Sequence, residues 1–192
     1  MAAVILVGAW LASGRQVEEE GDKKISTVYL ICGNTASGKS TYSLNLAEQI
    51  GAVYFSIDPW MQTLYGSDYD PQTHDFAWLT ERTQRCKKLI REVSEPILKN
   101  GISVILEIGF GDFDFREYYR KWALGIGADV SVHYLDIPVK ERRRRVKKRN
   151  EEKGSTYAFE VTDEMFDYVE PMFVPPDEDE LVNGKRITEY YT

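Results

Sequence analysis

Apolar and polar positions follow two different periods along the chain. Short apolar runs rich in strand-forming residues recur, and between them apolar residues return every three or four positions, which is typical of helices. The runs predict strands at Thr27–Cys32, Ala52–Ile57, Ile102–Ile108, Val130–Leu135 and Arg186–Tyr191. The intervening segments predict helices at Lys39–Ile50, Pro59–Tyr65, Phe76–Lys99, Arg116–Leu124, Val139–Asn150 and Asp163–Val169.

This alternation of strands and helices predicts an α/β fold. Strands and helices in succession form βαβ units, with a mainly parallel sheet and right-handed connections. Ligands of such sheets bind beyond the carboxyl ends of the strands. Residues that follow a predicted strand are therefore the first candidates for a functional site.

Length and composition fit one soluble globular domain, because the chain has 192 residues, of which 43% are hydrophobic and 29% are charged. We expect this domain to cover residues 25–192. Residues 1–24 are expected to be an extra strand or a disordered extension, since the apolar run Ala2–Ala12 is too short to span a bilayer. Cys32 and Cys86 do not suggest a disulfide framework, so we expect reduced thiols in a cytoplasmic protein without a membrane partner.

The segment after the first expected strand carries the strongest chemical signal. It reads Gly-Asn-Thr-Ala-Ser-Gly-Lys-Ser-Thr and fits G-x-x-x-x-G-K-[ST], the P-loop, in its usual place between a strand and a helix. Glycines let the backbone approach phosphates closely, and the loop amides can then cradle them. Lys39 would face the β- and γ-phosphates, and Ser40 would offer its hydroxyl to Mg²⁺. The alternative is an ordinary turn rich in glycine and serine.

The P-loop predicts a nucleoside triphosphate as ligand, with ATP and Mg²⁺ as the expected cofactors. The candidate nucleotide-binding residues are those of the loop itself: Gly33, Asn34, Thr35, Ala36, Ser37, Gly38, Lys39, Ser40 and Thr41.

Two carboxylates lie near the ends of the next predicted strands. Asp58 follows the second strand, where a kinase needs a group that accepts or orients the proton of an attacking hydroxyl. Alternatively, Asp58 caps the helix after it. Glu107 lies at the end of the third strand and could hold Mg²⁺ through water or position a substrate. Its alternative role is that of a salt-bridged or helix-capping glutamate.

The helix expected after the fourth strand is strongly basic and reads Glu-Arg-Arg-Arg-Arg-Val-Lys-Lys-Arg-Asn toward its end. A helical projection places Val139 and Val146 on the protein-facing side, with Arg142 and Arg149 beside them and Arg145 further round. Arginine suits phosphate because its fork binds two oxygens and stays charged. This pattern predicts a phosphate clamp, with a solvated charged helix as the alternative.

Several aromatic residues follow Asp58, namely Trp60, Tyr65, Tyr69, Phe76 and Trp78. They could line an acceptor pocket and exclude water from the transferring phosphate. They could equally form the core of a small helical insert, and the sequence favours neither interpretation.

With these residues the chain resembles the P-loop kinase-like ATP-binding proteins that include zeta-toxin, polynucleotide-kinase and chloramphenicol-phosphotransferase relatives. The resemblance covers roughly Thr27–Leu181, and its marks after the P-loop are Ser56–Met61, Leu64–Asp68, Arg145–Asn150 and Pro175–Glu180. It implies an adenylate-kinase-like, three-layer sandwich with five mainly parallel strands and the P-loop strand in the centre. It also implies a mobile helical lid around 139–175 that carries Arg145 and Arg149, with Asp58 as the candidate base.

The chain departs from part of this group just after Asp58. Toxin and polynucleotide-kinase relatives place an arginine there, whereas this sequence has Pro59, Trp60 and Met61. A net charge of −7 also argues against broad nucleic-acid binding. Both observations favour a small-molecule acceptor, although a nucleic-acid partner is not excluded.

Together these patterns predict an ATP-dependent kinase that moves the γ-phosphate to a hydroxyl of a small molecule. Its candidate catalytic residues are Lys39, Asp58, Arg142, Arg145 and Arg149, and its candidate metal ligands are Ser40 and Glu107. The alternatives are an ATP-binding regulatory protein or pseudo-kinase without transfer, and a nucleic-acid 5′-hydroxyl kinase. A GTPase switch is disfavoured, because the sequence has neither N-K-x-D nor D-x-x-G.

Overall fold

The computed structural model describes residues 25–70, 72–153 and 160–189, so the expected extension at 1–24 lies outside the described residues. The strands are β1 Thr27–Cys32, β2 Val53–Ser56, β3 Val104–Glu107, β4 Asp129–Leu135 and β5 Lys185–Ile187. The helices are α1 Lys39–Ile50, α2 Ile57–Tyr65, α3 Phe76–Lys99, α4 Phe113–Gly125, α5 Val139–Glu152, α6 Asp163–Val169 and the 3₁₀ helix η1 Glu170–Met172.

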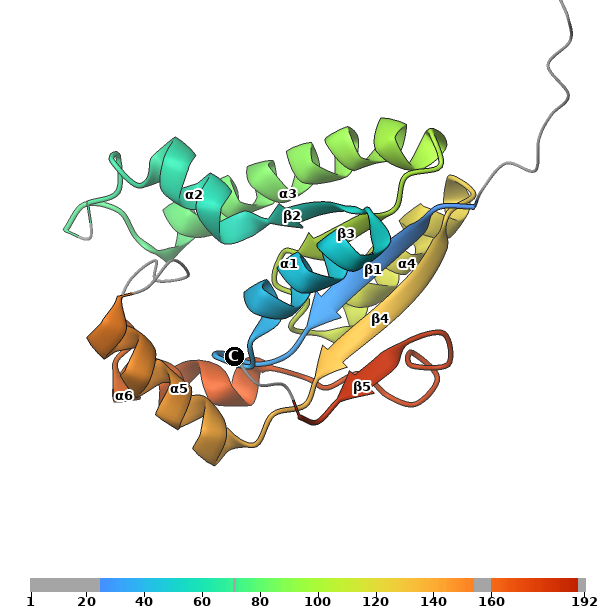
Figure 1. Ribbon diagram of the computed structural model, residues 1–192. Coiled ribbons are helices and arrows are strands. Elements are labelled where there is room, and N and C mark those ends of the chain that lie inside the picture. Colours follow the sequence, from blue (N-terminus) through green and yellow to red (C-terminus); the bar gives the residue numbers. More distant parts are fainter. Residues whose placement is uncertain (1–24, 71, 154–159, 190–192) are drawn as a thin grey trace, which may run out of the picture.

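The strands form one parallel sheet in the order β2-β3-β1-β4-β5, which confirms the α/β prediction and the central place of the P-loop strand (Figure 1). Alternate residues of β1 face opposite sides of the sheet. Val28 and Leu30 pack in the cluster that includes α3 and α4 residues, whereas Ile31 packs with Tyr42 of α1. Helices thus bury both faces, as parallel sheets require.

The long helix α3 has the predicted bounds because both of its ends carry clear signals. The side chain of Asp75 accepts a hydrogen bond from the Trp78 N–H (3.0 Å), which satisfies a donor of the first turn. At the other end the chain leaves the helix at Asn100, and Gly101 adopts a φ of +76° that glycine tolerates best. No helix in the described ranges is both long and apolar enough to cross a membrane.

The second strand and the helix after it meet earlier than predicted. β2 ends at Ser56, and α2 begins at Ile57 rather than at Pro59. Proline is tolerated in a first helical turn, because an N–H there has no partner within the helix. Ser56 is therefore the N-cap residue, and Asp58 lies within the first turn instead of capping it.

Three other elements begin or end a few residues away from the bounds predicted from the sequence. β3 is shorter than the predicted Ile102–Ile108. β5 begins at Lys185 and pairs with β4 through Lys185–Ile187, and residues 190–191 of the predicted strand lie outside the described residues. α4 begins at Phe113, three residues before the predicted start, because the Asp112 carboxylate accepts the Phe115 N–H at 2.8 Å and so caps the helix.

The expected lid corresponds to α5, α6 and η1, which lie beyond the carboxyl end of β1 (Figure 1). Part of the predicted range 139–175, residues 154–159, lies outside the described residues. Val146, Val161 and Phe166 form a small apolar cluster that joins α5 to α6, and Ala36 of the P-loop packs against it. The elements α5 and α6 thus contact the P-loop through this cluster.

Candidate functional site

The P-loop makes a tight bend that depends on particular backbone conformations. Gly33 has a φ of +148°, and a Cβ there would lie 2.7 Å from the Ser37 Oγ and 2.9 Å from the Leu135 carbonyl oxygen. Ala36 and Gly38 also have positive φ angles, of 59° and 95°. The Lys39 ammonium closes the bend by donating to the carbonyl oxygens of Gly33 (3.0 Å) and Asn34 (3.2 Å).

Beneath the loop, Glu107 joins three elements through its carboxylate. The parallel register of β2 and β3 places Glu107 opposite Ser56, and only 6% of the residue is exposed. Ser40 of α1 donates a hydrogen bond from its Oγ to Glu107 Oε1 (2.9 Å), and the Tyr54 hydroxyl of β2 donates to Oε2. Both carboxylate oxygens are therefore held in place.

The charges of Lys39, Asp58 and Glu107 act on one another. Burial lowers the pKa of Lys39, while the carboxylates of Glu107 and Asp58 act in the opposite direction. Burial likewise raises the pKa of Glu107, against the influence of Lys39 and the hydrogen bonds from Tyr54 and Ser40. Asp58 itself is exposed. The structure thus brings Lys39, Ser40 and Glu107 together and leaves the Asp58 carboxylate open to a ligand nearby.

The predicted magnesium ligands fit that ion by their chemistry. Mg²⁺ prefers hard oxygen donors, and in nucleotide sites it takes one or two from the protein and the rest from phosphates and water. Ser40 Oγ and Glu107 Oε1 lie 2.9 Å apart and supply such donors. Within the described part of the chain no group of three or more His, Cys, Asp or Glu residues could hold a metal ion by itself.

Among the predicted lid arginines, Arg142 has the most fixed position, with 4% of the residue exposed. Its guanidinium binds both carboxylate oxygens of Glu170, and it also donates to the carbonyl oxygens of Ile137 (2.8 Å) and Thr35 (3.3 Å). The backbone oxygen of the same Glu170 accepts the Asn34 side-chain amide at 3.0 Å. Arg142 and Glu170 therefore fasten α5 and η1 to the P-loop.

The other two arginines lie along the same side of α5. Arg145 donates from Nη1 to the Ser37 carbonyl oxygen (3.1 Å) and from Nε to Glu141 (2.9 Å). The Nε of Arg149 is buried and has no hydrogen-bond partner among the described residues. Val146 is buried between them, whereas Val139 is 43% exposed in the first turn. The protein-facing side of α5 thus includes Arg145, which the helical projection had placed further round.

Two residues of this site have no signal of their own in the sequence. Tyr54 shares the face of β2 that carries Ser56, but its link to Glu107 depends on the register between β2 and β3. Glu170 lies 28 residues after its partner Arg142, and one glutamate among many does not reveal such a pairing. Only alternation along β2 could have drawn attention to Tyr54.

The aromatic residues after Asp58 mostly hold α2 and α3 together. The Trp60 ring meets Phe55 of the core edge to face at 6.1 Å. Tyr65 and Tyr69 both contact Trp78, and the Arg82 guanidinium lies 3.6 Å from the centroid of the Trp78 ring. Of the predicted set, Phe76 stands apart, with 82% of the residue exposed. The structure therefore favours the helical-insert interpretation for this cluster.

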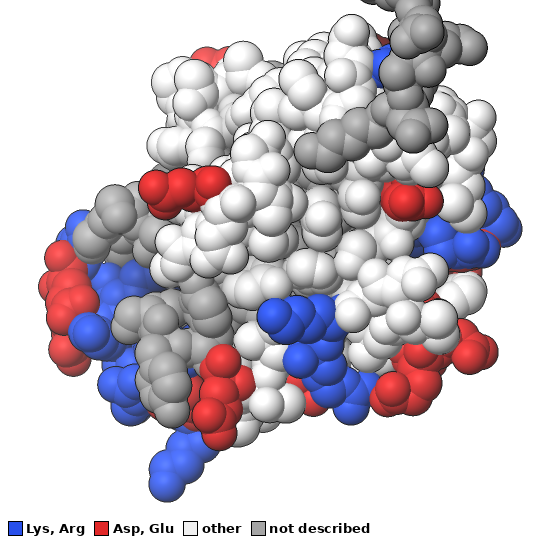
Figure 2. Space-filling view, turned by 45° about the vertical axis from the view of Figure 1, so that its right-hand side comes forward, with Lys and Arg blue, Asp and Glu red and all other residues white. Residues whose placement is uncertain are grey.

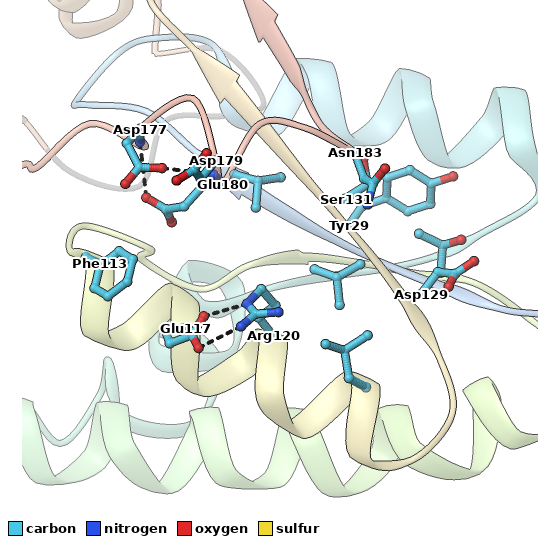
Figure 3. A pocket seen from close by; sticks show the side chains of 14 residues that line it. Tyr29, Phe113, Glu117, Arg120, Asp129, Ser131, Asp177, Asp179, Glu180 and Asn183 are labelled. Atoms are coloured by element: carbon cyan, nitrogen blue, oxygen red, sulfur yellow. Dashed lines mark hydrogen bonds and ion pairs between the residues drawn. The ribbon is translucent and has the colours of Figure 1, made fainter.

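A cavity of about 830 Å³ lies on another part of the molecule (Figure 3). Its lining includes Thr27 and Asp129, the first residues of β1 and β4, so it lies away from the P-loop. Two of its charged residues, Arg120 and Glu117, form an ion pair with one another, and a third, Glu180, binds the buried Arg116. None of the residues predicted from the sequence to form the site lines this cavity.

Most charges of the basic helix α5 are balanced by acidic neighbours. Arg143 pairs with Asp163 and Asp167 of α6, and Arg144 pairs with Glu141 at 2.8 Å. Figure 2 shows the same mixture on one face of the molecule, where acidic side chains lie among the basic ones. This arrangement gives little support to a basic surface for nucleic acid.

Comparison with known proteins identifies the fold. The model of a family described as "AAA domain" matches residues 28–175. No curated protein matches the chain. Among solved structures, a sugar kinase from Janibacter sp. HTCC2649 is 16% identical with a TM-score of 0.59, and the alignment covers 85% of each chain.

Two further structures share the fold at similar identity. The APS kinase CysC of Mycobacterium tuberculosis is 18% identical with a TM-score of 0.54, over 88% of this chain and 91% of that chain. Kti12 of Chaetomium thermophilum, in complex with ADP-AlF3, is 12% identical with a TM-score of 0.64, over 84% of this chain and 88% of that chain. The family match and the parallel sheet around the P-loop strand show that the chain belongs to the AAA domain family and is a P-loop kinase-like protein.

Proposed function

We propose that the protein is an ATP-dependent kinase that transfers the γ-phosphoryl group of ATP to a hydroxyl of a small molecule. The observation that carries this proposal is the bond from Ser40 of the P-loop helix to the buried Glu107, with Lys39 and Asp58 acting electrostatically on the same carboxylate. This set combines phosphate-binding, metal-binding and proton-accepting groups at the carboxyl edge of the sheet.

In the proposed reaction the acceptor oxygen forms a new bond to the γ-phosphorus while the bond to the β,γ-bridging oxygen breaks, and ADP leaves. The hydroxyl proton passes to the Asp58 carboxylate, which is exposed to solvent. Lys39 moves from the carbonyl oxygens of Gly33 and Asn34 to the phosphates and offsets their negative charge. Mg²⁺, held by Ser40 and Glu107 together with the nucleotide, would neutralise charge on the phosphate oxygens.

The arginines of α5 divide into two roles in this proposal. Arg142 positions the lid, because its donors are already bound to Glu170 and to backbone oxygens. Arg145 and Arg149 are the phosphate-binding pair, since one already reaches the P-loop and the other has an unsatisfied Nε. The unsatisfied Nε of Arg149 can donate to a phosphate oxygen without breaking an existing hydrogen bond.

Three observations support a small-molecule acceptor. The sequence after Asp58 lacks the arginine of the toxin and polynucleotide-kinase relatives, and acidic side chains lie among the basic ones on one face of the molecule (Figure 2). The structures that share the fold include a sugar kinase and an APS kinase. Because the reaction consumes ATP, we place the protein in the cytoplasm.

The proposal is tested by ATP consumption over a panel of alcohols, sugars, nucleosides and 5′-hydroxyl oligonucleotides. Lys39→Ala should abolish transfer, and Asp58→Asn should leave ATP binding intact but lower turnover by about a hundredfold or more, as expected when a general base is removed. Asp68→Asn, an exposed carboxylate after α2, is the matched control and should retain activity.

Three other outcomes would contradict a specific part of the proposal. Unchanged turnover of the Asp58→Asn variant removes that residue from the mechanism. ATP binding without transfer to any compound of the panel contradicts the kinase assignment and favours a nucleotide-binding regulatory protein. Transfer to oligonucleotides alone would replace the small-molecule acceptor by a nucleic-acid end.

A further inference from the structure

The side chain of Lys87 in α3 reaches the loop that follows β3. Its Nζ lies 4.1 Å from the centroid of the Phe115 ring, in the first turn of α4. It also lies 3.9 Å from the position that a Cβ on Gly109 would occupy. Gly109 comes two residues after Glu107, so their Cα atoms are at most about 7 Å apart. The ammonium group therefore lies at the same edge of the sheet as the proposed metal and phosphate ligands.

The charge of Lys87 is not matched by a carboxylate. Neighbouring cations of α3 form ion pairs along the helix, such as Lys88 with Glu92 (3.7 Å) and Lys99 with Glu95 (2.6 Å). Lys87 has neither an ion pair nor a hydrogen bond to the side chain of any residue in the described ranges. Its partial burial lowers its pKa, which is the effect expected of a cation that has lost water without gaining a full counter-charge.

The carboxylate whose charge acts on Lys87, that of Asp112, already accepts another hydrogen bond. It accepts the Phe115 N–H at 2.8 Å and caps α4, although it still acts to raise the Lys87 pKa. The first amides of α4, a helix of 13 residues, lie beside this point and carry the positive end of the helix dipole. Asp114 in the same turn is a second carboxylate, and its negative charge weakens the attraction of the helix terminus for an anion.

The loop around Gly109 leaves room for a ligand to approach. Gly109 is exposed and has a φ of +82°, and at Gly111 no atom lies within 4 Å of the position a Cβ would take. The cation is thus bordered on one side by an aromatic ring and on another by backbone without side chains. Such a place suits a small anionic group that can accept hydrogen bonds from an ammonium and from backbone amides.

From this arrangement we infer that Lys87 binds an anionic group of the acceptor, so that the substrate is a small alcohol carrying a carboxylate, sulfate or phosphate. The inference rests on the proposed function, because it assigns the substrate class of that same site. Lys87 would hold the anionic end of the acceptor, while its hydroxyl end lies toward Asp58 and the γ-phosphate.

The first test compares acceptors in matched neutral and anionic pairs: glycerol with glycerate, glucose with gluconate, and adenosine with AMP. The wild-type protein should use anionic members. Lys87→Met, which keeps the length and apolar contacts of the side chain, should raise KM for the anionic member about tenfold to a hundredfold, the loss expected for a hydrogen bond to a charged group. The KM for ATP should not change, and Lys87→Arg should restore part of the loss.

Lys88→Met is the matched control, because Lys88 is an exposed neighbour on the same helix and pairs with Glu92. It should behave as the wild-type protein. Transfer to neutral members only, or an equal effect of Lys87→Met on both members of a pair, overturns the inference and leaves the kinase assignment standing.

The second test measures anion binding without transfer. Sulfate and, separately, acetate are titrated into ¹⁵N-labelled protein saturated with magnesium and a non-hydrolysable ATP analogue, which blocks the P-loop. Amide signals of Gly109, Gly111 and Phe113 should shift in the wild-type protein and the Lys88→Met variant but not in Lys87→Met. Equal shifts in all three proteins, or none in the wild type, overturn the Lys87 site even where transfer is observed. If no transfer is found with any acceptor, the kinase assignment fails while this titration still decides the anion site.

Discussion

His133 should make the stability of the fold depend on pH between neutrality and about pH 4. The residue lies in β4 with 8% of its surface exposed, and its Nδ1 is 2.7 Å from the hydroxyl oxygen of Tyr42 in α1. The ring of Tyr29 meets it edge to face at 5.2 Å. Burial lowers the pKa of His133 to about 4, and the positive charge of Lys185 acts in the same direction.

The direction of this pH dependence follows from which state, folded or unfolded, binds the proton at the higher pH. The unfolded chain protonates His133 as the pH falls through its ordinary pKa of 6.5, whereas the folded protein resists protonation until about pH 4. Stability is therefore fully present above about pH 6.5 and is lost progressively as the pH falls toward 4. The difference between these two pKa values corresponds to about 3 kcal/mol at 1.36 kcal/mol per unit.

The assay is urea unfolding at several pH values between 7 and 4. His133→Gln, which stays neutral throughout, should be less stable than the wild type at pH 7 but should lose about 3 kcal/mol less between pH 7 and 4. The other histidine, His74, lies in the connection between α2 and α3, and His74→Gln leaves the surroundings of His133 intact. If His133→Gln and the wild type lose the same free energy of unfolding on acidification, the reasoning is wrong.

Two further changes test the packing around the site. Arg116→Met should lower the free energy of unfolding, measured with urea, by about 3–5 kcal/mol, because the Glu180 carboxylate, whose side chain is 10% exposed, would lose its cation. Arg120→Met removes an exposed ion pair and should cost about 1 kcal/mol or less in the same assay. Gly33→Ala should weaken nucleotide binding, measured by calorimetry, and lower the free energy of unfolding by about 1–3 kcal/mol, because the new Cβ would clash with the Leu135 carbonyl oxygen. Gly125→Ala is the control, because a Cβ at Gly125 meets no atom within 4 Å, and it should change neither quantity. Equal effects of the two substitutions would refute this account.

The parts of the fold that the sequence predicted are those with local signals. Asp75 and Asn100-Gly101 delimit α3, and the P-loop lies between a strand and a helix as expected. The start of α2 was misplaced because Ile57 continues the apolar run of β2, so that its side chain fits a strand as well as a helix. Prediction succeeds where local preferences agree with the tertiary structure. At the junction of β2 and α2 these preferences do not distinguish a strand from a helix.

The contacts of the candidate site were predictable only in part. Lys39, Ser40 and Glu107 follow from the motif and the strand ends, and the structure brings them together. The protein-facing side of α5 was partly misjudged, because the P-loop contacts Arg142 and Arg145, whereas Val139 is exposed. A helical projection shows which residues share a side, but which side is buried depends on what packs against it.

Pairings between distant residues could not be predicted at all. Arg116 and Glu180 are 64 positions apart and form a bidentate ion pair, with Arg116 also bound to the Val174 carbonyl oxygen at 2.8 Å. Their meeting depends on the path of the chain from α5 to β5, and each residue alone reads as an ordinary surface charge. The same holds for Tyr54, whose role depends on strand register.

The double contact of Glu170 sets a condition for protein engineering. Its carboxylate accepts hydrogen bonds from Arg142 and its main-chain oxygen accepts one from the Asn34 side chain, so one residue of η1 links α5 to the bend of the P-loop. A bend grafted from another P-loop protein would bring its own residue to position 34 and would lose this link unless the segment around 170 were transplanted with it. The two segments, more than a hundred positions apart, form a single exchangeable module.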